Sequence, residues 1–272
     1  MNFKHIILLA GLVAVSIPAC KSQVLAVKDR EVLPAISAPC FPGAYYRKAA
    51  TSFDTWTGIT GVVTLGYPKV DEHRLDTKTG QPLDNFSVYM GGSAGGHEVD
   101  AGLTWEFSTD SQGNISKRRN AWRPFWRTNN WNSAPNKPEY IWQPGDQVEM
   151  TVMMIAPQKL RMIIADTRHP EKKFQVDFDA PGFTYTNTRQ FKRVNAIDQS
   201  HNEGKPVQPT KAQVTGAEWL NTTLFRGVSH TRLPMNTSRF TDIRCSDASH
   251  IVVSTTDPAT GAEKIDIYGT AP

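Results

Sequence analysis

The chain has 272 residues, of which 39% are hydrophobic and 21% are charged, a composition typical of a globular protein that can bury a core. Its formal net charge of +4 is too small for this length to indicate a nucleic-acid-binding protein, so we expect no nucleic acid among its partners. No stretch after residue 20 is long and apolar enough to cross a bilayer, which takes about 20 apolar residues.

The N-terminus has the pattern of an export signal. Lys4 and His5 precede an apolar run at positions 6–15, and a small residue directly precedes Cys20. A basic start, an apolar run and small residues before a cleavage site mark a secretory signal. A cysteine at this point resembles the bacterial lipoprotein signal, in which the thiol is lipidated. We therefore predict a signal peptide over 1–19 and an acyl anchor on Cys20, which holds an extracytoplasmic protein to a lipid bilayer of the bacterial cell envelope. Ordinary secretion with an unmodified Cys20 is the alternative.

Two further cysteines, Cys40 and Cys245, lie near the two ends of the remaining chain. Thiol pairs tend to oxidise outside the cytoplasm, so we predict a disulfide between them. The loop that it closes would constrain the unfolded chain by about 4–5 kcal/mol in the chain-entropy model. Two unrelated free thiols are the alternative. Residues 20–39 show no sustained period, and we interpret them as the lipidated N-terminus and a tether to a domain over 40–272.

Short runs rich in β-branched and aromatic residues, separated by Gly, Pro and Asn, predict strands throughout the domain. In chain order the runs cover 59–65, 86–90, 99–107, 147–155, 160–166, 174–178, 191–197, 217–225, 250–254 and 264–268. No segment of a dozen residues has a convincing helical period. We therefore predict an all-β fold with one domain, an antiparallel double-sheet β-sandwich or jelly roll of the concanavalin-like kind.

Three stretches of the predicted strands are similar to the glutamic peptidases, the eqolisin family of acid proteases with a double-sheet β-sandwich fold. The stretches are VYMGG at 88–92 with VDAGLTW at 99–105, PGDQVEMTV at 144–152, and TGAEWL at 215–220. The resemblance implies that Glu218 stands where the family has the glutamate that activates water. It also implies that Asp100 stands where the family has a glutamine that helps to hold the oxyanion.

Asp100 departs from the family's pattern, because a carboxylate cannot donate the hydrogen bond that an amide donates. Two acids close together could instead share a proton and catalyse hydrolysis at low pH, with one pKa raised. The alternative is that only the fold is retained and the site is inactive. Glu218 and Asp100 would then be ordinary surface acids.

Four of the seven tryptophans fall within a short aromatic region, at Trp122, Trp126, Trp131 and Trp142. Amides and guanidiniums are interleaved with them, among which we single out Asn130. Flat apolar rings with polar groups at their edges suit sugars, and the same mixture can hold an extended peptide. The alternative is that the rings fill the core, because tryptophan is usually largely buried.

The sequence contains no established pattern for a metal, a cofactor or a covalent nucleophile. There is no His-Glu-x-x-His or Cys-x-x-Cys spacing and no Gly-x-Ser-x-Gly elbow. His97 and Glu98 precede Asp100, but neighbouring residues of a strand point to opposite faces and would not easily hold one ion. We therefore expect no metal and no cofactor.

Three functions remain open. The first is a module that binds a glycan or peptide on a concave sheet face, with the aromatic region lining that face; it requires two or more of the four tryptophans to be exposed together. The second is an acid hydrolase, which requires the carboxyls of Asp100 and Glu218 to lie within about one water of each other. The third is a non-catalytic envelope protein that contacts other proteins.

Overall fold

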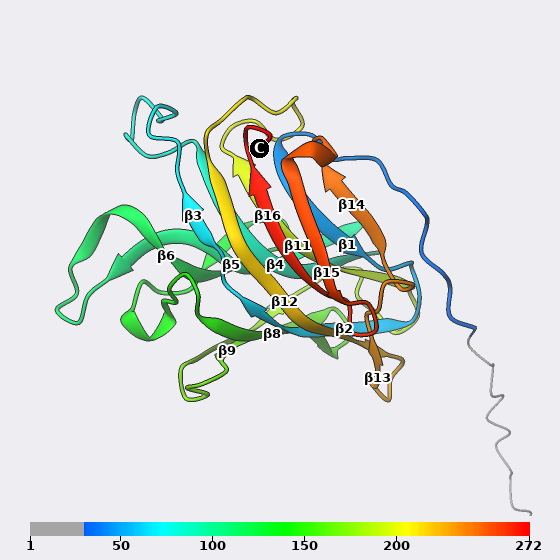
Figure 1. Cartoon of the computed structure of the whole chain (residues 1–272). Coiled ribbons are helices and arrows are strands. Elements are labelled where there is room, and N and C mark those ends of the chain that lie inside the picture. The colour runs from blue at the N-terminus through cyan, green and yellow to red at the C-terminus, as the bar shows by residue number, and fades with distance from the viewer. Residues whose placement is uncertain (1–29) are drawn as a thin grey trace, which may run out of the picture. The chain divides into compact units, whose positions relative to one another are not determined.

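Two antiparallel β-sheets make up the structure, a computed structural model that describes residues 30–272 (Figure 1). This part of the chain contains 16 strands, and its helical residues are confined to two short 3-10 turns, Pro138–Tyr140 and Ala248–His250. The predicted all-β sandwich is therefore confirmed. No helix within residues 30–272 has the length and apolarity that crossing a membrane requires. The predicted signal peptide and Cys20 lie outside the described residues.

The first sheet has seven strands, in the spatial order β14-β1-β11-β4-β5-β6-β7. Their bounds in that order are Thr241–Cys245, Ala44–Ala50, Arg189–Gln199, Asp84–Ala94, His97–Thr109, Ile115–Arg127 and Trp131–Ser133. Long antiparallel ladders join β1 to β11, β11 to β4 and β4 to β5. These ladders place side chains from five or more strands in rows across one surface.

The second sheet has nine strands. Its main path runs β10-β9-β8-β2-β12-β16-β15, and the short strands β13 and β3 pair with β12. The bounds along the path are Lys173–Asp179, Lys159–Asp166, Gln147–Ala156, Trp56–Thr64, Gln213–Arg226, Ala262–Tyr268 and Ile251–Asp257; β13 is Thr231–Pro234 and β3 is Tyr67–Lys69. The predicted hairpin is the β8–β9 pair.

The core lies between the two sheets and follows from alternation along each strand. In β8 the side chains of Met150, Val152 and Met154 are buried in the core, whereas the intervening residues are less buried. A strand places successive side chains on opposite faces, so one face of each sheet is apolar and packs against the other sheet. Each large apolar side chain buried in this way contributes about 1.5–3 kcal/mol.

An ionic cluster also joins the two sheets inside the sandwich. Glu263 of β16 accepts a hydrogen bond from Arg47 of β1 at 2.9 Å and lies 3.0 Å from a guanidinium nitrogen of Arg193 of β11. Arg193 donates to the backbone oxygen of Gly261 at 2.6 Å and to the Thr222 hydroxyl. These charges are therefore paired within the protein, between the two layers.

The disulfide prediction is confirmed. Cys40 is bonded to Cys245, with 5.7 Å between their Cα atoms. Part of the segment interpreted as a tether also contacts the sandwich: the Val32 amide donates to the Asp54 carboxylate at 2.9 Å, and the Thr241 hydroxyl donates to the Ala35 carbonyl. The bridge and these bonds hold residues 32–40 against the edge strand β14 and the segment that follows β1.

Two long strands, β1 and β6, were missing from the prediction. β1 has Arg47 and Lys48 at its centre, and β6 reads ISKRRNAWRPFWR, with Pro124 among several arginines. Charged residues and proline are depleted in strands, so sequence alone did not favour strands at these positions. In the folded protein both strands pair with their neighbours, and charged side chains such as Arg47 and Arg127 find acidic partners there.

Candidate functional site

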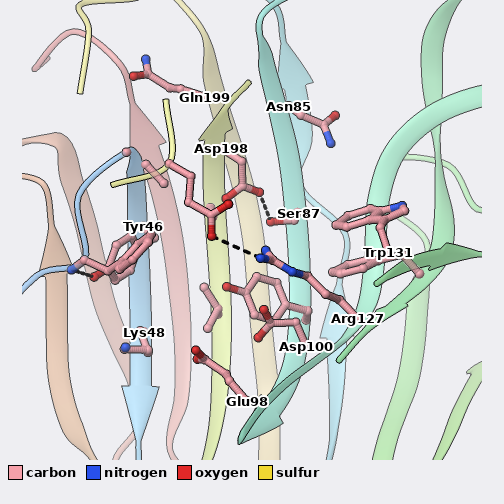
Figure 2. A pocket seen from close by; sticks show the side chains of 18 of the residues that line it. Tyr46, Lys48, Asn85, Ser87, Glu98, Asp100, Arg127, Trp131, Asp198 and Gln199 are labelled. Carbon is pink, nitrogen blue, oxygen red and sulfur yellow. Dashed lines mark hydrogen bonds and ion pairs between the residues drawn. The ribbon is translucent and has the colours of Figure 1, made fainter. Parts of the chain in front are cut away.

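A hollow of about 520 Å³ opens on the face of the seven-stranded sheet that points away from the core (Figure 2). On β4 the residues Phe86, Val88 and Met90 enter the core, so the alternate residues Ser87 and Tyr89 line the hollow. The same alternation on β1, β11, β5 and β6 supplies most of its lining. Its volume lies within the range of about 300–1,000 Å³ typical of ligand sites.

One row of charged side chains crosses the hollow. The ladders place Lys192, Gly91, Asp100 and Arg127 side by side on β11, β4, β5 and β6. Gly91 has no side chain, so the Lys192 ammonium reaches across it to an Asp100 oxygen at 2.7 Å. A Cβ atom at Gly91 would lie 1.9 Å from the Val99 carbonyl oxygen, which makes glycine a requirement of this row.

Lys192 is the cation at the centre of this acidic surface. Its side chain is only 6% exposed and contacts the carboxylates of both Glu98 and Asp100. Burial lowers the pKa of Lys192, but the negative charges of Asp100 and Glu98 outweigh burial and raise it overall. Burial acts to raise the pKa of Glu98, and the neighbouring Lys192 lowers it overall. Lys192 and Glu98 are therefore charged at neutral pH.

A second ion pair joins the sheet to the loop that follows β11. The Arg127 guanidinium donates to the Glu203 carboxylate at 3.2 Å. Figure 2 shows Arg127 extending over the hollow toward this partner, with Asp100 and Asp198 nearby. The loop is held in place by Asn202, whose buried amide donates to Gln199 and to the Pro206 carbonyl. The loop therefore forms one side of the hollow.

Asp198 lies farther along β11, between Ala44 of β1 and Asn85 of β4. Its carboxylate accepts a hydrogen bond from the Ser87 hydroxyl at 2.6 Å. Within residues 30–272 no Lys or Arg nitrogen lies within 4.0 Å of it. Burial raises the pKa of Asp198 to about 6; the Ser87 hydrogen bond and the charge of Arg127 oppose this rise, and the negative charges of Asp100 and Glu203 add to it. Asp198 is thus a carboxyl of the hollow that has no direct ion pair in the described chain.

Aromatic rings form part of the lining. Phe125 and Trp131 stack with 4.4 Å between their centroids and 5° between their planes, and Tyr89 meets the edge of Phe125. Gly102 stands between Tyr89 and Phe125 in the sheet and leaves room for these rings. Tyr46 lies on the opposite side of the hollow from Trp131 (Figure 2). Trp131 is 50% exposed, so it has a free surface for a ligand.

The four tryptophans do not share one exposed face. Trp122 and Trp142 are buried in the core, and Trp126 is half-buried and packs on Phe174 at 5.9 Å. Only Trp131 lines the hollow, because alternation in β6 and the turn into β7 send the other rings inward or to the side. The expectation that two or more are exposed together is therefore not met. Asn130 is exposed but does not line the hollow.

Asp100 and Glu218 do not meet. Asp100 lies on the outer face of the seven-stranded sheet, in the hollow. Glu218 belongs to β12 of the nine-stranded sheet, and its neighbour Trp219 enters the core, so Glu218 points to the opposite, outer side of the sandwich. The core separates the two carboxyls, which corrects the expectation that they act on one water. The acids that share the hollow with Asp100 are Glu98, Asp198 and Glu203.

Sequence reasoning missed Lys192, Asp198, Tyr89 and Phe125. The strands of the first three, β11 and β4, were largely predicted, and alternation along β11 would have grouped Lys192 with Asp198 on one face. Phe125 lies on β6, which was not predicted. The register between strands was not available from the sequence, so neighbours across the sheet could not be assigned. Within residues 30–272 no three His, Cys, Asp or Glu side chains are grouped as metal ligands would be.

Comparison with known proteins supports the fold. No protein-family model and no curated protein sequence matches the chain. Among solved structures, scytalido-glutamic peptidase with a transition state analog inhibitor superposes with a TM-score of 0.55 at 8% identity, covering 83% of this chain and 98% of that one. SCP-B, a member of the eqolisin family in complex with the tripeptide Ala-Ile-His, gives a TM-score of 0.50 at 10% identity, with the same coverage. The chain therefore has a remote likeness of fold to the glutamic peptidases.

Proposed function

We propose that the protein binds an extended polymer, a peptide or a glycan, in the hollow of the seven-stranded sheet. The observation that carries the proposal is the convergence of a half-exposed indole, Trp131, with charged groups of four strands on one concave surface of about 520 Å³. Ligand sites combine an apolar lining with a few placed polar groups in this way.

On the outer face of the other sheet, charged side chains of the described residues pair without an aromatic-lined hollow of this size beside them. There, Arg161 and Asp177 form a simple pair between neighbouring strands, with 2.6 Å between a guanidinium nitrogen and a carboxylate oxygen. Peptides also occur on the same fold: SCP-B was solved with a tripeptide, and scytalido-glutamic peptidase with a peptide-based transition state analog. The first observation favours the hollow as the ligand site, and the second favours a peptide as the ligand.

An array of peptides and glycans probed with the domain tests the proposal. We expect Trp131→Ala to weaken binding of the best ligand by about tenfold, the effect of losing one stacked or hot-spot aromatic contact. Phe53→Ala is the matched control, because Phe53 is also half-exposed but does not line the hollow. Absence of any ligand, or equal effects of both variants, contradicts the proposal and leaves a protein that only contacts other envelope proteins.

Hydrolysis is a second candidate function. Asp198 and Asp100 share the hollow, and Asp198, with a pKa of about 6, is protonated in mild acid while Asp100 is paired with Lys192. A protonated acid beside an ionised one is the arrangement of a general acid and a general base. Cleavage of a bound ligand below about pH 6 that both Asp198→Asn and Asp100→Asn abolish would establish it. Binding without cleavage at any pH would exclude it.

We also propose that Cys20 carries an acyl anchor and that the protein is attached to a membrane of the bacterial cell envelope. The support is the basic start, the apolar run and the position of the cysteine in the sequence. Metabolic labelling with a radioactive fatty acid tests this, with Cys20→Ser as the control. Label that persists in Cys20→Ser, or no label in the parent protein, contradicts the anchor.

A further inference from the structure

The charges of the hollow do not balance. Four carboxylates line it, on Glu98, Asp100, Asp198 and Glu203, against three cations, on Lys48, Lys192 and Arg127. Lys192 contacts both Glu98 and Asp100, and Arg127 contacts Glu203. Asp198 is the carboxylate without an ion-pair partner in the described chain.

Lys48 is not an ion-pair partner of Asp198. It shares a face of β1 with Tyr46 and lies 5.7 Å from the centroid of the Tyr46 ring. Burial and the neighbouring charge of Lys192 lower the pKa of Lys48, and the carboxylates that act on it are Glu98 and Asp100. Lys48 therefore interacts with Glu98 and Asp100, at the end of the hollow away from Asp198.

The surroundings of Asp198 favour a positively charged group from outside. Desolvating a carboxylate without a counter-ion is costly, and a cation that enters removes that cost. The rings of Tyr46, Tyr89 and Trp131 line the same hollow, and aromatic faces attract cations. The remaining titratable groups that face the hollow from its elements are Lys48, Glu98, Asp100, Arg127, Lys192, His201 and Glu203.

Three of the residues around Asp198 have small side chains. Ala44 stands beside it on β1, and Ala196 and Ser87 form the next row of the sheet. Tyr46 belongs to the same row as Ala196 and Ser87, and Tyr89 belongs to the row beyond it. A long side chain that ends in a charge can reach past these rings to Asp198, whereas the amino group of an amino sugar is attached directly to a bulky ring.

We propose that the hollow selects extended peptides that carry a lysine or arginine side chain, whose positive charge pairs with the Asp198 carboxylate. This rests on the proposed function and adds the chemistry of the ligand. Asp198 is then the specificity-determining residue, and the aromatic rings contact the aliphatic part of the bound side chain.

The test compares short peptides that are identical except for one central residue: lysine, arginine, norleucine or glutamate. An oligomer of glucosamine and its N-acetylated form are measured beside them by calorimetry. At about pH 7.5 we expect the lysine or arginine peptide to bind about tenfold or more tightly than the norleucine peptide. We expect Asp198→Asn to reduce that preference to about twofold or less, because the amide keeps the Ser87 hydrogen bond but not the charge.

The preference should also fade as the pH falls through about 6, because protonated Asp198 no longer attracts the cation. Asp179→Asn, which changes an exposed acid outside the hollow, should leave the preference unchanged. Equal binding of the norleucine peptide, a preference that survives Asp198→Asn, or selection of the glucosamine oligomer overturns this inference alone. If no peptide and no glycan binds, the proposed function fails as well.

Discussion

Lys192 and Arg193 are neighbours in β11, yet they occupy two very different environments. Lys192 points into the hollow, and Arg193 points between the sheets. Arg193 is 1% exposed, and its charge is held by Glu263, by a backbone oxygen and by a hydroxyl. Lys192 is also almost buried, but one of its two partners, Glu98, has a side chain that is 60% exposed.

The difference separates a structural charge from one that is part of a site. Around Arg193 every partner comes from the protein, and the rings of Trp219 and Phe240 lie over the guanidinium. Around Lys192 the carboxylates border an open concave surface that also holds Asp198, an acid without an ion-pair partner in the described chain. The first arrangement joins the sheets, and the second leaves charge available to a ligand.

The largest loss of stability should come from breaking the buried ionic cluster of Arg47, Arg193 and Glu263. Within residues 30–272, Glu263 is the acid that contacts both Arg47 and Arg193, so Glu263→Gln leaves Arg193 as a buried charge without its counter-ion. We expect a loss of about 3–5 kcal/mol in the free energy of unfolding, as for other buried pairs that lose one partner. Urea unfolding measures it. A loss no larger than that of the surface variant Asp177→Asn would contradict the structural role of this cluster.

A smaller loss of stability is expected at the cluster of Lys192, Glu98 and Asp100 in the hollow. Lys192→Met removes the cation, but Glu98 can turn toward solvent and thus relieve the repulsion from Asp100. We expect a loss of about 1–2 kcal/mol in unfolding free energy, together with weaker or altered ligand binding. Urea unfolding of Lys192→Met and Glu263→Gln under the same conditions compares the two losses of unfolding free energy directly. If Lys192→Met were the more destabilising of the two, the distinction between a structural cluster in the core and a ligand-binding cluster in the hollow would be wrong.

The smallest expected change in stability concerns Asp198 and depends on pH. The folded protein raises the pKa of Asp198 from 3.8 to about 6, so between these values the folded state binds more proton than the unfolded state. The contribution of this group to stability therefore falls as the pH rises from about 4 to about 6. Asp198→Asn should be more stable than the parent at about pH 7.5, by about 1 kcal/mol, and equal to it at about pH 3.5.

Thermal unfolding at the two pH values measures this difference. Asp177→Asn is the control, because the Asp177 pKa is lowered by Arg161 and the acid lies at the surface. An Asp198→Asn protein that is destabilised at about pH 7.5 would mean that the charge is already compensated, and would contradict the unpaired state of Asp198.

The sequence by itself determined the fold class and the disulfide. Runs such as 147–155 and 160–166 alternate strongly enough to specify strands, and they form the β8–β9 hairpin. Cys40 and Cys245 were the pair left after Cys20 was assigned to the lipid, and they are bonded. These conclusions depend on local pattern and on composition, both of which are present in the chain before it folds.

The site was decided only by the tertiary structure. The sequence placed Asp100 among the candidates but paired it with Glu218, which belongs to the other sheet and points away from it. It also grouped four tryptophans, of which Trp131 alone lines the hollow. The physical reason is that a side chain's face follows from alternation within its strand, whereas its neighbours follow from the register between strands. That register places Lys192 beside Gly91 and Asp100, although Lys192 lies far from both in the sequence.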